Sequence, residues 1–66
     1  MKKYKVICNE GTDFCRWTEE EPQTERQLRE YFYYIGKNNE GFTTKKEDYT
    51  LDYISDIWNV TIEEVK

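Results

Sequence analysis

The chain has 66 residues, of which 14 are acidic and 10 are basic, and it contains two cysteines and no histidine. Its length predicts a single domain, residues 1–66, with a small core, because a chain this short buries only about 60% of the surface that its unfolded form exposes. The lack of histidine excludes histidine-based acid–base catalysis and histidine-ligated zinc, and two cysteines are too few for a four-thiolate zinc site. The net charge of −4 argues against a general nucleic-acid-binding surface.

The apolar runs are too short for an export signal or a membrane span. Only Val6, Ile7 and Cys8 follow one another before Asn9. A secretory signal needs about 7–15 apolar residues, and a membrane-spanning helix needs about 18. We therefore expect a cytoplasmic protein without a membrane partner. In that compartment Cys8 and Cys15 stay reduced and serve as small core residues.

Two strands are predicted near the N-terminus, over residues 3–8 and 13–18. Gly11 and Thr12 lie between them and suit a two-residue hairpin loop, since glycine at the first central position is typical of a type II′ turn. A three-residue loop is the alternative. The register with the two-residue loop places three pairs opposite each other: Tyr4 and Glu19, Val6 and Trp17, and Cys8 and Cys15.

This register sorts the predicted hairpin into an apolar and a polar face, which a slip by one residue would scramble. Two apolar residues, Ile7 and Phe14, break the sorting and lie on the polar face. Exposed apolar residues on an open sheet face are typical of a contact surface. We therefore predict that this face could pair two copies of the chain as a homodimer.

A first helix is predicted over residues 25–35. Thr24 and Gln27 have the spacing of a capping box, in which each side chain accepts a hydrogen bond from the other residue's backbone. Gly36 suits the position just after a helix. The apolar stripe of this helix consists of Leu28, Tyr31, Phe32 and Ile35.

A polar loop over residues 36–46 follows, and Phe42 is expected to hold it to the core. A second helix is then predicted over residues 50–58, capped by Thr50 or Asp48. Its apolar residues at helical spacing are Leu51, Ile54, Ile57 and Trp58. Asn59 tolerates the left-handed conformation that ends helices.

Residues 60–65 are β-branched and nearly alternate between apolar and polar side chains, which favours a strand. Paired with either of the first two strands, this segment completes a three-stranded sheet. We therefore predict an α+β fold of order ββααβ, with a three-stranded sheet covered on one face by two helices. The expected core is Val6, Cys8, Cys15, Trp17, Leu28, Tyr31, Phe32, Ile35, Phe42, Leu51, Ile54, Trp58, Val60 and Ile62.

Residues 50–65 also resemble the helix-turn-helix of bacterial DNA-binding proteins, with apolar residues, Ser55 and Asn59 at the family's spacing. The resemblance implies a recognition helix that begins near Thr61, and a small DNA-binding transcriptional regulator as the alternative function. The exposed positions of that helix would carry Glu63 and Glu64, whereas DNA affinity comes largely from Lys and Arg on phosphates. Nucleic acid is therefore not the expected partner.

Three aspartates recur every fourth residue, at Asp48, Asp52 and Asp56. A solvated helix face explains such a row most simply, since like charges at this spacing are mildly unfavourable. The sharper hypothesis is a row of carboxylates that occupies the basic groove of a nucleic-acid-binding protein. Charge complementarity of that kind speeds association and sets specificity.

Tyrosines form the second candidate binding group. Tyr33 and Tyr34 lie off the apolar stripe of the first helix, and Tyr49 and Tyr53 are also candidates for exposure. Tyrosine is enriched at interface hot spots. We take Tyr33, Tyr34 and Tyr53, with the three aspartates, as candidate partner-binding residues, and no residue as catalytic, cofactor-binding or metal-binding.

The start Met1-Lys2-Lys3, the excess of Lys, Asn, Ile, Tyr and Glu, and the acidic balance at very small size resemble the accessory proteins of phages and prophages of low-GC Gram-positive bacteria. That resemblance implies a non-enzymatic protein that acts by protein–protein contact on a host or phage protein. Some proteins of this kind inhibit a host factor by occupying its nucleic-acid site. We expect the same here, through the aspartate row.

Overall fold

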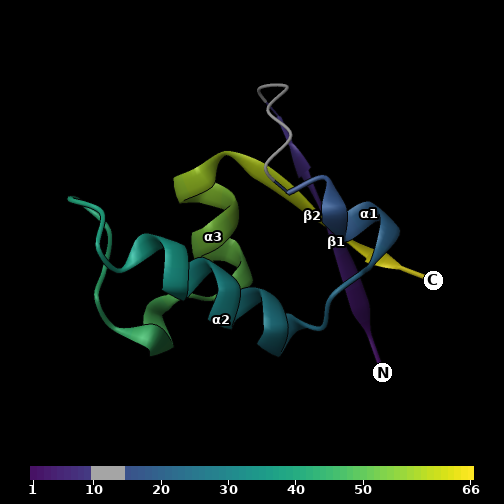
Figure 1. Cartoon of the computed structure of the whole chain (residues 1–66), viewed down its shortest axis with the longest axis horizontal. Helices are drawn as coiled ribbons and strands as arrows, with labels where there is room; N and C mark the ends of the chain where they lie inside the picture. The colour runs from purple at the N-terminus through teal and green to yellow at the C-terminus, as the bar shows by residue number, and fades with distance from the viewer. Residues whose placement is uncertain (10–14) are drawn as a thin grey trace.

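The computed structural model describes residues 1–9 and 15–66 (Figure 1). Its elements are β1 (Lys3–Cys8), α1 (Trp17–Glu20), α2 (Glu25–Gly36), the short 3-10 helix η1 (Lys46–Asp48), α3 (Leu51–Trp58) and β2 (Val60–Val65). In Figure 1, α2 and α3 lie together on one side of the two strands, and α1 lies beside β1 on the other side. The α+β class is confirmed, whereas the predicted order of elements is not.

The described residues form a sheet of two antiparallel strands, β1 and β2, so the predicted three-stranded sheet is wrong. The prediction of a strand over residues 60–65 is confirmed, and this strand pairs with β1. Lys3 lies opposite Val65, and Cys8 lies opposite Val60. Because side chains alternate along a strand, one face of the sheet turns Val6 and Val60 into the core, where both are buried.

The second predicted strand, residues 13–18, is wrong where the structure describes it. Cys15 and Arg16 form a turn, and helix α1 begins at Trp17. Trp17 and Glu19 therefore do not pair with β1. The reason lies in the glutamates that follow Trp17, because Glu is depleted in strands and is a good helix former. The predicted hairpin loop at Gly11-Thr12 lies outside the described residues.

Thr18 closes part of the edge of β1 that the missing strand was expected to cover. Its side chain is fully buried. The hydroxyl accepts a hydrogen bond from the backbone N–H of Val6 at 2.8 Å and donates one to the carbonyl of Cys15 at 2.7 Å. Further along the same edge, Tyr4 and Gln23 exchange two backbone hydrogen bonds of 2.7 and 2.9 Å.

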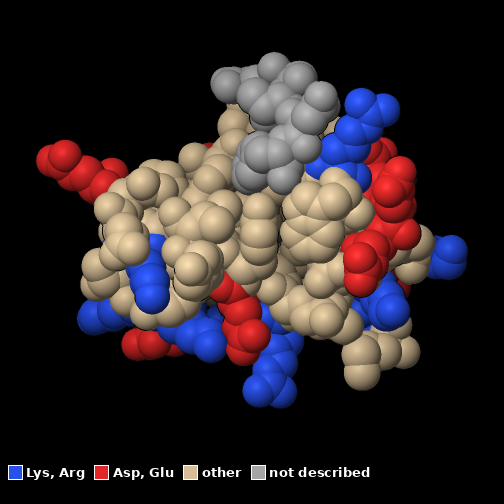
Figure 2. Space-filling view, viewed as in Figure 1, with Lys and Arg blue, Asp and Glu red and all other residues tan. Residues whose placement is uncertain are grey.

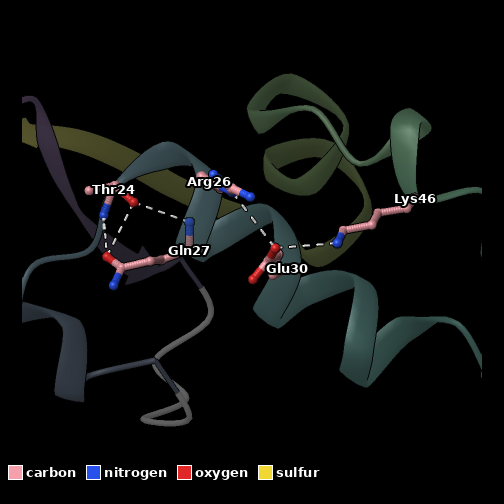
Figure 3. Close-up of polar contacts among 5 residues, drawn as sticks. All are labelled: Thr24, Arg26, Gln27, Glu30 and Lys46. Atoms are coloured by element: carbon pink, nitrogen blue, oxygen red, sulfur yellow. Dashed lines mark hydrogen bonds and ion pairs between the residues drawn. The ribbon is translucent and has the colours of Figure 1, made fainter.

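The first predicted helix is confirmed as α2, and so is its capping box (Figure 3). Thr24 Oγ1 accepts from the Gln27 N–H at 3.2 Å, and Gln27 Oε1 accepts from the Thr24 N–H at 2.9 Å. Gly36 does not follow the helix as predicted, because it is the last residue of α2. A Cβ added at Gly36 would lie 2.7 Å from the Trp58 ring and 2.8 Å from the Tyr49 hydroxyl, so close packing requires glycine here.

The second predicted helix is confirmed as α3, with Thr50 as its N-cap and Asn59 at its end in the left-handed conformation, φ 52°. Strand β2 begins at the next residue, Val60. The helix that the helix-turn-helix resemblance implies near Thr61 is therefore absent, and the segment is a strand. β-branched residues favour this outcome because they pack well on a pleated sheet.

The core agrees with the prediction at most positions and differs at two aromatic residues. Six of the fourteen expected residues are buried: Val6, Cys15, Leu28, Phe32, Ile54 and Val60. Six more are partly buried and pack against them: Cys8, Tyr31, Ile35, Leu51, Trp58 and Ile62. Trp17, expected in the core, is 38% exposed because it lies on α1 instead of a strand. Tyr49, a candidate for exposure, is fully buried between α2 and α3, and its hydroxyl donates to the carbonyl of Thr43 at 2.8 Å.

Candidate protein-binding surface

Helix α3 carries two of the predicted aspartates on its outward face. Ile54 is fully buried and Leu51 and Trp58 pack against the core, which leaves Asp52 and Asp56 exposed on the opposite side. The two residues are one turn apart, about 6 Å along the helix axis. They therefore form a short acidic row that is accessible to a partner.

Asp48 does not extend this row along the same helix. It is the last residue of η1, and the chain turns between it and α3, which starts at Leu51. The Asp48 carboxylate accepts a hydrogen bond of 2.9 Å from the Thr43 hydroxyl, and this contact ties the preceding loop to η1. Asp48 is exposed, but part of its acceptor capacity is used within the fold.

Ile57 belongs to the outward face of α3 and was missed among the candidate binding residues. Its side chain is 38% exposed. In the sequence it was counted with the apolar residues of this helix, although it lies off the stripe formed by Leu51, Ile54 and Trp58. Its place next to Asp56 in the sequence could have indicated that Ile57 lies toward the outward face. The outward face thus combines two carboxylates with one apolar side chain.

The charges of α3 are not balanced by basic residues. The helix contains no Lys or Arg, and among the described residues no ion pair includes Asp52 or Asp56. Asp52 in the first turn suits the positive end of the helix dipole, whereas Asp56 lies near the negative end, where a carboxylate costs about 0.3–1 kcal/mol. Among the described residues, no basic side chain offsets this cost at Asp56.

The carboxylates of α2 behave differently, because each has a basic partner. Arg29 Nη1 lies 3.9 Å from Glu25 Oε2, and Glu30 Oε1 lies 3.9 Å from Arg26 Nε and 3.3 Å from Lys46 Nζ. Figure 3 shows the Glu30 carboxylate between Arg26 of the same helix and Lys46 of η1.

These side chains line an open groove between α2 and η1. The lining residues are Glu25, Arg26, Arg29, Glu30, Lys46 and Glu47. Arg29 also closes the floor of the groove, since its Nε donates to the carbonyl of Tyr49 at 2.8 Å and its Nη2 to that of Glu47 at 3.3 Å. The groove is therefore a joint between two elements, in which Glu25 and Glu30 pair with basic residues of the fold.

The three candidate tyrosines do not form one exposed group. Tyr34 is 72% exposed, with the Lys37 ammonium 5.5 Å from the centre of its ring. Tyr33 is half-buried against the Tyr49 ring at 5.6 Å, and Lys37 and Lys46 lie near its ring. Tyr53 is half-buried as well.

Tyr53 has a structural role, because it contacts both the loop before η1 and the buried Tyr49. Its hydroxyl accepts a hydrogen bond of 3.1 Å from the backbone N–H of Thr43, and its ring packs against Tyr49 at 5.3 Å. Burial raises the pKa of the Tyr49 phenol above its usual value, and the neighbouring Tyr53 and Tyr33 raise it further. Tyr49 and Tyr53 thus hold the loop before η1, and only Tyr34 is fully available to a partner.

The outer face of the sheet is the surface predicted for a homodimer. It carries Lys3, Lys5 and Ile7 from β1 and Thr61, Glu63 and Val65 from β2. Lys5 Nζ lies 3.7 Å from Glu63 Oε1, and Ile7 is half-buried, so the apolar area on this face is smaller than expected. Phe14 lies outside the described residues, and the homodimer stays a prediction.

Cys8 and Cys15 are both free thiols, and Cys15 is fully buried. Burial raises the pKa of the Cys15 thiol to about 12, and the nearby Cys8 contributes to the shift. A thiol with so high a pKa is a poor nucleophile and a poor metal ligand at neutral pH. Within residues 1–9 and 15–66, no three His, Cys, Asp or Glu side chains gather where they could hold a metal ion.

None of the helices in the described ranges combines the length and the apolar character that crossing a membrane requires. No protein-family model, curated protein or solved structure matches this chain. The case for a function therefore depends on the geometry and the charges of its own surfaces.

Proposed function

We propose that this chain is a non-enzymatic accessory protein of the phage type, which acts by binding another protein through the outward face of α3. The partner is a nucleic-acid-binding protein of the host, and the chain inhibits it by occupying its basic groove. The contact residues are Asp52, Asp56 and Ile57, with Tyr34 of α2 as a further exposed aromatic side chain.

The observation that carries this proposal is the contrast between the carboxylates of α2 and α3. Glu25 and Glu30 have basic partners within the fold, whereas Asp52 and Asp56 have none among the described residues. Their mutual repulsion costs about 0.2–0.5 kcal/mol. Charges that lower stability and serve no contact within the fold are typical of binding surfaces, where function is retained against stability.

The chemistry of the surface matches a groove lined by Lys and Arg. Two carboxylates one turn apart on a helix can each accept hydrogen bonds from a basic side chain of the partner. Long-range attraction between the acidic chain and such a groove raises the association rate. Ile57 supplies the apolar contact area that charged groups alone do not provide.

The test is capture of the partner from a lysate of the native host, followed by mass spectrometry. The immobilised chain is compared with the double variant Asp52→Lys/Asp56→Lys. We expect the unmodified chain to retain a nucleic-acid-binding protein that duplex DNA displaces, and the double variant to retain none of it.

A matched control changes the same amount of charge elsewhere. Glu19→Lys/Glu20→Lys reverses two exposed carboxylates on α1, and this variant should retain the partner. If the Asp52→Lys/Asp56→Lys variant captured the partner as well as the control does, the outward face of α3 would not be the binding surface. A partner that DNA cannot displace would contradict the occupation of a nucleic-acid site.

A further inference from the structure

The two edges of the sheet differ in how their backbone groups are used. In an antiparallel pair, successive residues point their N–H and C=O groups alternately toward the partner strand and away from it. On β1, Tyr4 and Val6 point away from β2, because Tyr4 exchanges hydrogen bonds with Gln23 and Val6 donates to Thr18. The outer edge of β1 is therefore closed at Tyr4 and Val6.

The pairing of the two strands also shows which backbone groups of β2 point away from β1. Lys5 lies opposite Glu63, and Val6 lies opposite Ile62. Since Val6 points its backbone groups away from β2, Ile62 points its own away from β1, and Glu64 does the same two residues later. The outer edge of β2 thus presents two N–H and two C=O groups in an alternating order.

No described residue covers this edge. The strand order is β1-β2 only, and no backbone hydrogen bond joins Ile62 or Glu64 to a segment outside the sheet. Val60 is buried at the start of β2, but Glu63, Glu64 and Val65 are exposed. The accessible part of the edge is therefore Ile62 to Val65.

From this geometry we infer a second binding site, in which an extended segment of another protein, rich in Lys and Arg, adds to the sheet along the outer edge of β2. An unpaired strand edge binds another strand because its backbone groups match only an extended chain. This site is separate from the outward face of α3 and does not depend on it.

Strand β1, which pairs with the inner edge of β2, shows which side chains suit a strand that lies beside β2. The sequence of β1 is Lys-Tyr-Lys-Val-Ile-Cys, and its Lys5 ammonium lies 3.7 Å from the Glu63 carboxylate across the ladder. Glu63 and Glu64 project from opposite faces of β2. A strand on the outer edge therefore meets a carboxylate on each face, and opposite charges across a ladder are favourable.

A second copy of β2 does not fit the edge as well. Antiparallel pairing of two such strands centred on Glu63 or Glu64 sets like charges directly opposite each other, which is destabilising. The two bodies would also each carry a net charge of −4. Figure 2 shows acidic and basic side chains together near α1 and the C-terminal end of β2, so the charges that favour a basic occupant are those of Glu63 and Glu64 on the strand itself.

The test uses amide hydrogen exchange measured by NMR, with a blocked synthetic peptide of sequence Thr-Lys-Val-Lys-Val-Lys-Thr as the probe. In the free chain we expect rapid exchange at Ile62 and Glu64 and slow exchange at Glu63. At saturating peptide, exchange at Ile62 and Glu64 should slow by about tenfold or more, because both amides gain hydrogen bonds. The same peptide with Glu for every Lys should have no effect.

Three variants separate edge pairing from simple charge attraction. Glu64→Gln removes the charge and keeps the N–H, whereas Glu64→Pro also removes an N–H that points away from β1, which an edge strand tolerates. We expect Glu64→Pro to fold and to bind the peptide about tenfold more weakly than Glu64→Gln does. Glu63→Pro should lose the fold, since it removes a hydrogen bond to β1.

Three results would overturn the inference. Slow exchange at Ile62 and Glu64 in the free chain would show that the edge is already covered. Equal peptide affinity of Glu64→Pro and Glu64→Gln would show that no backbone pairing occurs. Peptide-induced protection confined to α3 would place a basic segment on the surface of Asp52 and Asp56 instead.

Discussion

Helices α2 and α3 lie next to each other, yet they use charge in opposite ways. The carboxylates of α2 pair with Arg26 and Arg29 of the same helix and with Lys46, and the Lys46 pair joins the helix to η1. Those of α3 face outward, with no basic residue on their own helix. The comparison teaches that acidity alone does not indicate a binding surface. Two carboxylates one turn apart on the same helix face, with no basic partner among the described residues, are the stronger sign.

The largest effect is expected at the joint between the two helices, where Tyr49 is buried. Because folding raises the pKa of this phenol, the folded state favours its neutral form. Its contribution to stability is therefore complete below the ordinary value of 10.0 and is lost as the pH rises above it. A buried phenolate costs more than a lost hydrogen bond. Urea unfolding as a function of pH should show a steeper alkaline loss for the unmodified chain than for Tyr49→Phe.

The prediction is wrong if the unmodified chain and the Tyr49→Phe variant lose the same amount of stability as the pH rises. Cys15 also ionises in this range, since its pKa is raised to about 12, but it contributes equally to both chains. The difference between the two curves therefore isolates Tyr49.

Gly36→Ala tests the packing of α2 against α3. The added methyl group would lie 2.7 Å from Trp58 and 2.8 Å from the Tyr49 hydroxyl, so these rings must move. Overpacking of this kind costs about 1–3 kcal/mol, even though alanine favours helices more than glycine does. Thermal unfolding measures the effect. Gly41→Ala is the contrasting variant, because no atom lies within 4 Å there and its cost comes from a φ of 89° alone. Unchanged stability of Gly36→Ala would show that the helices are not closely packed at this point.

Arg29→Ala tests whether the charges of α2 act structurally. Arg29 donates two hydrogen bonds to backbone carbonyls around η1, and losing bonds from a charged donor costs about 2 kcal/mol. Arg26→Ala is the matched control on the same helix. Its side chain is 89% exposed with one ion pair of 3.9 Å, so the change should stay within about 0.5 kcal/mol. Equal losses in urea unfolding would contradict the distinction.

Thr24→Ala tests the start of α2. The variant removes the acceptor for the Gln27 N–H and should cost about 1 kcal/mol. Thr24→Ser keeps the hydroxyl and should be nearly neutral. The midpoints of chemical unfolding distinguish the two variants, and similar midpoints would show that the capping box adds little.

The smallest effects are expected on α3, and their signs are diagnostic. Asp56→Lys places a cation at the negative end of the helix dipole and should stabilise the chain by about 0.5 kcal/mol. Asp52→Lys removes a favourable charge from the first turn and should destabilise it by about 0.5 kcal/mol or less. The double variant then keeps its stability while it loses the proposed partner. Destabilisation by Asp56→Lys in thermal unfolding would show that Asp56 has a structural contact, and the proposed binding surface would lose its basis.

Local rules predicted α2 and α3 well, because the signals of these helices lie within a few residues of one another. The capping box at Thr24 and Gln27 and the left-handed Asn59 are set by neighbouring backbone groups. The exposure of Asp52 and Asp56 followed from the helical spacing of the apolar residues around them. These parts of the fold and of the candidate surface needed no tertiary information.

The predictions were wrong where the same local sequence pattern is compatible with two different structures. Residues 13–18 alternate as a strand does, but Thr18 satisfies the edge of β1 with a hydroxyl from α1, which no spacing rule reveals. Tyr49 looked exposed because its burial depends on α2, α3 and the Thr43 loop together. Gly36 was assigned to a helix end, although its role is set by rings from distant segments.

The amino-acid sequence by itself determined the α+β class, both long helices with their caps, the last strand and an acidic surface, since all of these depend on short-range spacing and composition. Only the tertiary structure decided that the sheet has two strands among the described residues, that Tyr49 lies in the core, and that one edge of the sheet is closed while the other is open. These features depend on which segments far apart in the chain come into contact. The free energy of such contacts depends on many residues together, so it cannot be inferred from any single segment of the sequence.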